Sequence, residues 1–184
     1  MILLFLMNPD RYFFCALSAA ALHEAGHLAA ARAAGTGIAE MRLGISGAVI
    51  IPEGSLSSYG SDAAVAFWGA GANILGMIAA ALIYRVCPCP EMICFFFANL
   101  FLGAFNLVPA PGSDGALLLY SLVAARRGQE RAERVREKAG RISLALTAAF
   151  SLWLLLELKN ASVTLILLGH ITDALSSRFG RRSS

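Results

Sequence analysis

This 184-residue chain contains a succession of apolar stretches, most of them long enough to cross a lipid bilayer. A helix needs about 20 predominantly apolar residues to span the hydrocarbon core. The mean hydropathy of +0.67, with 58% hydrophobic and only 15% charged residues, lies outside the range of water-soluble domains. The sequence therefore predicts an all-α polytopic membrane protein with about five to six membrane segments. These segments are expected at 12–34, 62–84, 92–108, 115–125 (half-length), 142–158 and 161–177.

The apolar stretches follow each other without a long Ser/Pro-rich linker, so residues 1–184 are predicted to form a single membrane domain. Its core is expected at about 12–125, followed by a C-terminal helical hairpin at about 142–177. Residues 38–52 have a different character, because glycines interrupt two short apolar segments there. This pattern predicts a small β-hairpin after the first apolar stretch.

The net charge of +3 comes from basic residues beside apolar stretches, without the aromatic-interleaved pattern of nucleic-acid-binding surfaces. No nucleic-acid partner is therefore expected. Positive residues favour the cytoplasmic side of a membrane, so the basic connection at 126–141 is predicted to be a cytoplasmic loop. By alternation of the segments, residues 23–27 and Asp114 then lie toward the cytoplasmic half. The cations in question are Arg126, Arg127, Arg131, Arg134, Arg136, Lys138 and Arg141, with Arg178, Arg181 and Arg182 near the C-terminus.

The four cysteines, Cys15, Cys87, Cys89 and Cys94, do not form the paired Cys-x-x-Cys motifs of structural zinc sites. A disulfide among Cys87, Cys89 and Cys94 is an alternative if the turn that contains them faces an oxidising compartment. The cysteines are therefore given no functional role.

The motif His23-Glu24-Ala25-Gly26-His27 lies within the first apolar stretch. Histidines at i and i+4 project from one helix face and can bind one zinc ion, and the glutamate between them lies beside the metal without binding it. Zinc lowers the pKa of bound water toward about 7, so Glu24 is a candidate general base. The alternative is that these side chains only bridge neighbouring helices. Ionisable groups within an apolar span are costly and usually functional, which favours the metal site.

A catalytic zinc ion usually takes three protein ligands and keeps one position for water, so a third ligand is needed. Most acidic residues lie at predicted segment ends or in the basic connection, which leaves Asp114 and Asp173. Asp114 follows the helix break Pro109-Ala110-Pro111-Gly112, and non-helical backbone at membrane depth is tolerated where it lines a cavity or a hydrated site. His170 and Asp173, spaced i, i+3 on the last segment, could also bind metal, but the favoured interpretation is a buried pair near the membrane edge.

The second motif is Asn106-Leu107-Val108-Pro109-Ala110-Pro111-Gly112-Ser113-Asp114-Gly115. With both motifs, the chain resembles the site-2 protease family of intramembrane metalloproteases over about residues 12–125. The resemblance implies that His23, His27 and Asp114 bind one Zn²⁺ ion per chain and that Glu24 is catalytic. The residue before the aspartate is usually apolar in the family and is Ser113 here, which leaves the local packing open.

The stretch Gly69-Ala70-Gly71-Ala72-Asn73 is similar to the family's Gly-Pro-x-x-Asn pattern, with alanine in place of proline. The resemblance implies a catalytic role for Asn73, whose amide would hold the scissile carbonyl or donate to its developing oxyanion. The alternative is a packing asparagine that forms hydrogen bonds between membrane helices.

The resemblance also implies an activity and its partners. The expected enzyme hydrolyses peptide bonds within or near transmembrane segments of membrane-bound proteins, as in regulated intramembrane proteolysis. Its expected partners are single-pass substrate proteins, regulatory membrane proteins and the lipid bilayer. The compactness of the chain favours a bacterial plasma membrane, with an archaeal or organellar membrane as the alternatives. The family has a small membrane-associated sheet beside the active site, at the position of residues 38–52. A strand edge there would pair with the backbone of an unwound substrate.

Two other functions are weighed against a protease. A catalytically silent membrane scaffold would keep the zinc site for stability and contain the same motifs. A metal transporter would usually have several intramembrane acidic or histidine residues stepped along a path, whereas this chain has one cluster. Zinc content and a cleavage assay with a Glu24 variant separate the enzyme from the scaffold.

Overall fold

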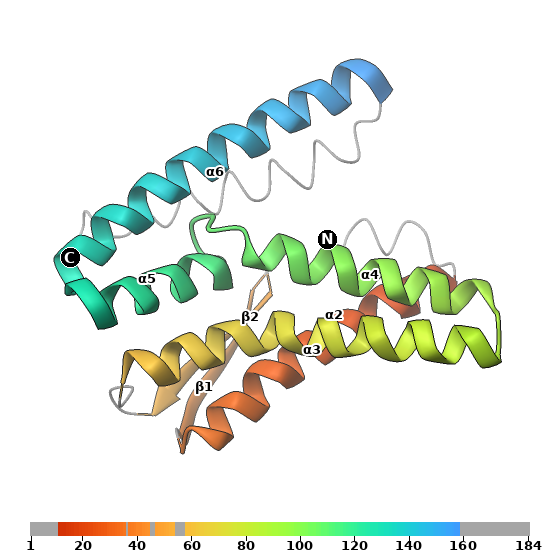
Figure 1. Cartoon of the computed structure of the whole chain (residues 1–184), viewed down its shortest axis with the longest axis horizontal. Coiled ribbons are helices and arrows are strands. Elements are labelled where there is room, and N and C mark those ends of the chain that lie inside the picture. The colour runs from red at the N-terminus through yellow and green to blue at the C-terminus, as the bar shows by residue number, and fades with distance from the viewer. Residues whose placement is uncertain (1–10, 36, 45–46, 54–57, 159–184) are drawn as a thin grey trace.

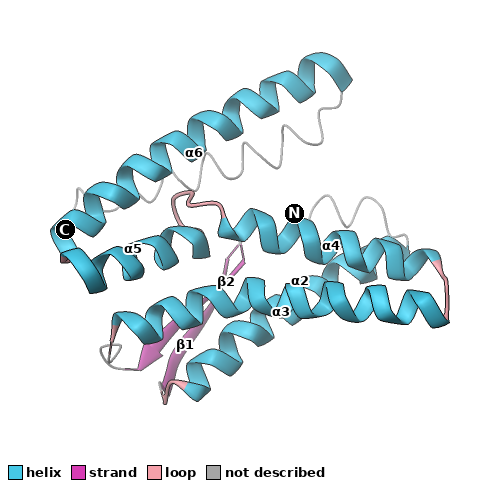
Figure 2. Ribbon diagram, in the orientation of Figure 1, coloured by secondary structure: helices cyan, strands magenta, loops and turns pink. Residues whose placement is uncertain are grey.

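The computed structural model describes residues 11–35, 37–44, 47–53 and 58–158 (Figure 1). Within these ranges the chain forms helices and one antiparallel hairpin, shown by type in Figure 2. The elements are α2 (Arg11–Ala33), β1 (Gly37–Gly44), β2 (Gly47–Glu53), α3 (Tyr59–Val86), α4 (Pro90–Leu107), α5 (Asp114–Arg127) and α6 (Gln129–Leu158).

Helix α3 is the centre of the bundle. It packs against α2, α4 and α5, while α2 also packs against α4 and α6 packs against α5. Figure 1 shows α3 and α4 side by side along the long axis, with α6 leaving the bundle at an angle. Every described helix that carries a predicted site residue therefore either is α3 or contacts it.

The packed side of α3 consists of small residues, among them Gly69, Ala70 and Gly76. Small residues let helices approach closely, which matters where lipid tails are as apolar as the side chains. Large apolar side chains such as Leu82 and Phe101 are exposed instead, at 60% and 68%. Two of the described helices, α3 and α4, are long and apolar enough to cross a membrane.

The helical fold class agrees with the sequence, and the number of membrane segments stays a prediction. The segment expected at 161–177 lies outside the described residues, and so do His170 and Asp173. Strands β1 and β2 pair antiparallel from Gly37 with Glu53 to Gly44 with Gly47, with an irregularity between Ile38 and Glu40. Association of this hairpin with a membrane is likewise still a prediction.

The prediction of a loop at 126–141 is wrong. Helix α5 continues to Arg127, Gly128 reverses the chain with a φ of 80°, and α6 begins at Gln129. The basic stretch is helical because it is rich in Glu, Arg, Lys and Ala, which are strong helix formers. A pair spaced i, i+4, Glu130 with Arg134 at 3.3 Å, also favours the helix.

The break between α4 and α5 lies where the prolines are. Helix α4 ends at Leu107, and Gly112 has a φ of 86°, a left-handed conformation that favours glycine. Ser113 then caps α5: its Oγ accepts a hydrogen bond from the Ala116 N–H at 3.2 Å and lies 2.6 Å from the Val108 carbonyl oxygen. The serine thus has a local role as an N-cap, and Asp114 becomes the first residue of α5.

Candidate metal centre

His23 and His27 lie one turn apart on the side of α2 that faces α3. Both are buried, at 4% and 8% exposure. Their Nε2 atoms lie 3.1 Å apart, although the rings are nearly perpendicular, with an interplanar angle of 86°. The two rings therefore converge on one point through the same kind of nitrogen.

Asp114 completes this cluster from α5. Its Oδ2 atom lies 3.0 Å from Nε2 of His23 and 3.1 Å from Nε2 of His27. Three potential ligand atoms thus form a nearly equilateral triangle. Ligand atoms of a tetrahedral zinc site with bonds of about 2.0–2.1 Å lie about 3.3 Å apart, close to the observed edges. Two imidazoles and one carboxylate are also a donor set that zinc prefers, so the residues fit the metal.

The other nitrogen of each ring faces a hydrogen-bond acceptor on α3. Nδ1 of His27 lies 2.8 Å from the Val65 carbonyl oxygen, and Nδ1 of His23 lies 2.6 Å from Oδ1 of Asn73. A carbonyl oxygen only accepts, so the His27 proton must be on Nδ1. In the neutral imidazole, Nε2 is then unprotonated and can bind a metal. Partners of this kind fix the orientation and tautomer of metal-binding histidines.

Glycines make room for this arrangement. A Cβ atom on Gly26, within the histidine motif, would lie 2.2 Å from the Trp68 carbonyl oxygen. A Cβ atom on Gly115 would lie 2.2 Å from the Leu107 carbonyl oxygen. Side chains at these positions would separate α2 from α3 and would push the start of α5 away from the end of α4. Glycine at both positions therefore lets α2 and α5, the two helices that carry the ligand candidates, meet beside α3.

Glu24 precedes the pair Ala25-Gly26 on α2 and is half-buried. It adjoins His23 in the chain and is not part of the triangle of ligand atoms. Its position beside the cluster is compatible with the general base that the motif predicts.

Asn73 is fully buried, and its contacts bear on the two roles considered for it. Its Nδ2 atom donates to the Ala19 carbonyl oxygen at 3.0 Å and to Oδ1 of Asn99 at 2.8 Å. Its Oδ1 atom faces His23. With both amide protons donated inside the bundle, this arrangement favours the packing role over donation to an oxyanion. It also joins Asn73 to a metal-ligand candidate.

The motifs in the sequence did not indicate Val65, Asn99 or the glycines at which the helices come into close contact. Val65 acts through its backbone, so no residue type signals it. Asn99 had a usable signal, because a polar amide in the middle of an apolar span is unusual. All four cysteines are free thiols, so the structure contains none of the disulfides considered for the turn at 87–94.

Residues 89–150 match the model of peptidase family M50. This range covers α4, α5 and most of α6, and it includes Asp114 but not the histidine motif. The fold is similar to that of the Site-2 Protease from Methanocaldococcus jannaschii, with a TM-score of 0.70 at 23% sequence identity, over 95% of this chain and 82% of that chain. No curated protein matches the chain. The family match and the shared fold agree with the resemblance that the two motifs indicate.

Proposed function

We propose, from the two motifs, the match to the peptidase family M50 model and the fold shared with a site-2 protease, that this chain is a zinc endopeptidase that cuts membrane proteins within or near their transmembrane segments. One observation carries the proposal: two imidazole Nε2 atoms and a carboxylate oxygen from helices α2 and α5 lie 3.0–3.1 Å from one another. This is a donor set for one metal ion with a position left for water.

His23 and His27, as neutral imidazoles, and Asp114, as a carboxylate, would hold the ion. With one negative ligand, the occupied site would keep a net charge of +1, since the ion is divalent. When bound, zinc supplies Lewis-acid activation of the scissile carbonyl and of the attacking water. The burial of both histidines keeps this charge out of bulk water, where its effect would be screened.

Glu24 moves the proton in this proposal. Its carboxylate accepts a proton from the attacking water and gives it to the leaving amine as the peptide bond breaks. The role requires a side chain beside the ligands that does not bind the metal itself, and the position after His23 supplies one. A carboxamide at this position would keep the size and lose the basicity.

The proposed substrate is a transmembrane segment of another protein, as the resemblance implies. A transmembrane helix has its amides in internal hydrogen bonds, so it must unwind locally before hydrolysis. The described sheet has two strands, β1 and β2, so each has one edge without a strand neighbour. Pairing of the unwound substrate with such an edge would satisfy its freed backbone groups, as in other complexes that form by strand addition. Regulated intramembrane proteolysis of single-pass proteins is the corresponding biological role.

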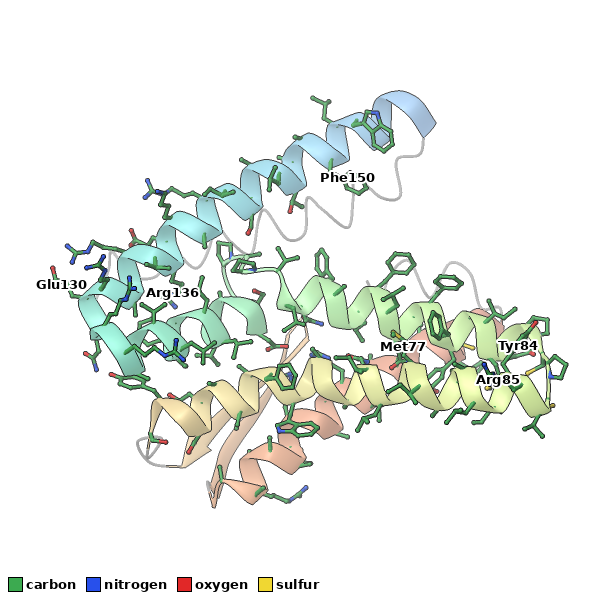
Figure 3. All side chains as sticks on the ribbon, viewed as in Figure 1. Met77, Tyr84, Arg85, Glu130, Arg136 and Phe150 are labelled. Carbon is green, nitrogen blue, oxygen red and sulfur yellow. The ribbon has the colours of Figure 1, made fainter. Side chains whose placement is uncertain are left out.

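The proposed setting is a bacterial plasma membrane with the site toward the cytoplasm. Figure 3 shows Glu130 and Arg136, in the basic part of α6, at the opposite end of the molecule from Tyr84 and Arg85. Between residues 129 and 141, α6 contains five exposed or half-exposed cations against three anions, and Arg126 and Arg127 precede them at the end of α5. The five cations are Arg131, Arg134, Arg136, Lys138 and Arg141. Such a cationic end favours the cytoplasmic side.

The test uses the full chain, purified in detergent and returned to vesicles with a single-pass substrate that carries a helix-weakening segment. Wild-type protein is expected to contain about one zinc per chain and to cut the substrate, and Glu24→Gln is expected to retain zinc and lose cleavage. Glu137→Gln is the matched control, because Glu137 is an exposed residue of α6. Zinc binding without cleavage by the wild type would instead identify the silent scaffold, and cleavage by Glu24→Gln would contradict the proposed chemistry.

A further inference from the structure

We infer that Asn99, on α4, is a positioning residue for the metal centre. It holds the Asn73 amide in the one orientation that keeps the His23 proton on Nδ1 and leaves Nε2 free for the metal. The inference rests on the proposed metal site and not on peptide hydrolysis. The hydrogen bonds of the Asn99 side chain join it to Asn73 and to the Phe95 carbonyl oxygen, so its effect on His23 passes through Asn73.

The two histidines differ in what orients them. The partner of His27 Nδ1 is the Val65 carbonyl oxygen, a backbone atom that only accepts. The partner of His23 Nδ1 is the side-chain amide of Asn73, whose oxygen and nitrogen exchange places when the amide rotates by half a turn. In the rotated state an N–H would face Nδ1, and the His23 proton would move to Nε2. The Asn73 amide therefore needs an anchor that the His27 partner does not.

Asn99 supplies this anchor through a series of hydrogen bonds that ends on backbone carbonyls. Nδ2 of Asn99 donates to the Phe95 carbonyl oxygen at 2.8 Å, so Oδ1 of Asn99 faces Asn73 and accepts from it at 2.8 Å. Nδ2 of Asn73 also donates to the Ala19 carbonyl oxygen at 3.0 Å. Rotation of the Asn73 amide would turn its oxygen toward two acceptors and leave both without a donor.

Because both asparagines are buried, the Asn73 amide is restricted to a single orientation. Asn73 and Asn99 are 0% and 1% exposed, so water does not replace a lost partner. Buried amides without partners are strongly disfavoured, and a fully satisfied network gives a single arrangement. The hydrogen bonds thus transmit the fixed position of the Phe95 carbonyl to the tautomer of His23.

The helices leave room for this pair of amides at two glycines. A Cβ atom on Gly76 of α3 would lie 2.7 Å from Oδ1 of Asn99 and 2.6 Å from Cδ2 of Leu22. A Cβ atom on Gly103 of α4 would lie 3.2 Å from Cβ of Asn73. Glycine on each helix therefore lets the two asparagines meet between α3 and α4. Replacement of Gly76 gives a way to disturb the anchor without changing either asparagine.

The experiment measures the His23 tautomer by ¹⁵N NMR of labelled histidine in the full-length, metal-free protein in micelles, with His23 assigned by substitution. For this readout all proteins carry Asp114→Ala, because the Asp114 carboxylate 3.0 Å from Nε2 of His23 would otherwise hold a second proton on the ring. In this background the protein with Asn99 is expected to have the His23 proton on Nδ1, and Asn99→Leu is expected to give a mixture of the Nδ1 and Nε2 tautomers. With Asp114 in place, Asn99→Leu is expected to weaken Co²⁺ binding about 10- to 100-fold, the range for partners of metal ligands. Co²⁺ is used because its absorption spectrum also reports ligand geometry.

Three further variants separate positioning from packing. Asn99→Asp is expected to be neutral at this buried position, so it keeps an acceptor oxygen toward Asn73 and an O–H donor toward the Phe95 carbonyl oxygen. It is expected to bind Co²⁺ within about threefold of the wild type. Gly76→Ala is expected to reproduce the tautomer mixture. Ser121→Ala is the control: it removes another fully buried polar group, whose Oγ has no hydrogen-bond partner in the described residues, and it is expected to change neither readout.

The inference is overturned if Asn99→Leu, folded by elution and thermal unfolding, keeps the His23 proton on Nδ1 and the wild-type Co²⁺ affinity. If Asn99→Leu does not fold, the decision passes to Gly76→Ala, and an unchanged tautomer there overturns the inference. Failure of the proposed function would be seen in other measurements, as a wild type that binds no metal or cuts no substrate. The tautomer measurement needs neither metal nor substrate, so it tests the role of Asn99 separately.

Discussion

Nε2 of His27 lies 2.3 Å from the position that a Cβ atom on Gly69 would occupy. Cε1 of His23 would be 2.8 Å from the same atom. Helix α3 thus approaches the metal-binding face of α2 at a residue without a side chain. Even one methyl group there must move a ring or separate the helices.

We therefore expect Gly69→Ala to weaken Co²⁺ binding by more than about 100-fold, since even the partners of ligands account for 10- to 100-fold. Titration against a competing chelator measures this. Gly60→Ala is the matched control on the same helix, because its Cβ atom would only meet Ser58 Oγ at 3.5 Å, an ordinary contact. Equal affinities for the two variants would contradict the close approach of α3.

Asp114→Asn tests the third ligand. The change keeps the size of the side chain and removes the only negative charge among the three ligand candidates, so zinc affinity is expected to fall by more than about 100-fold. Elemental analysis of the purified protein measures the remaining metal. Asp62→Asn, in the first turn of α3, removes a charge without touching the triangle and is expected to retain full zinc content.

Metal removal should lower stability as well as activity. Zinc that binds only the folded protein stabilises it by about 2.7 kcal/mol at a free concentration 100 times Kd. Thermal unfolding of the chelated protein, with and without added zinc, should show this increase in Tm for the wild type. The Asp114→Asn protein should show almost none, and an equal increase in both would mean that zinc binds elsewhere.

Ser113 links helix capping to the metal centre. Ser113→Ala removes the N-cap of α5 and is expected to cost about 1 kcal/mol of stability. Because Asp114 is the first residue of α5, zinc affinity is expected to fall too. Ser58→Ala is the matched control: it removes the N-cap of α3, where Ser58 Oγ accepts from the Ser61 N–H at 3.2 Å. Thermal unfolding should show similar losses for both, while only the Ser113 variant should lose metal affinity.

Local features of the sequence determined a large part of this protein. The length of the apolar stretches indicated helices α2, α3 and α4, and the spacing of His23 and His27 placed them on one face of α2. The stretch Pro109–Gly112 ended α4, because prolines and a left-handed glycine interrupt a helix whatever surrounds them. Where local propensity was overlooked, as in the basic stretch that begins α6, the prediction was wrong.

The hydrogen-bond partner of each histidine Nδ1 atom, and the glycines at which the helices come close, became known from the tertiary structure alone. Val65 and Asn99 belong to the site because α3 and α4 pack against α2. Gly69 and Gly76 determine how closely these helices approach each other. These relationships join residues far apart in the chain, and they depend on backbone atoms and on absent side chains. The periodicity of one segment carries no information on them, because a helix presents the same pattern whichever neighbour it meets.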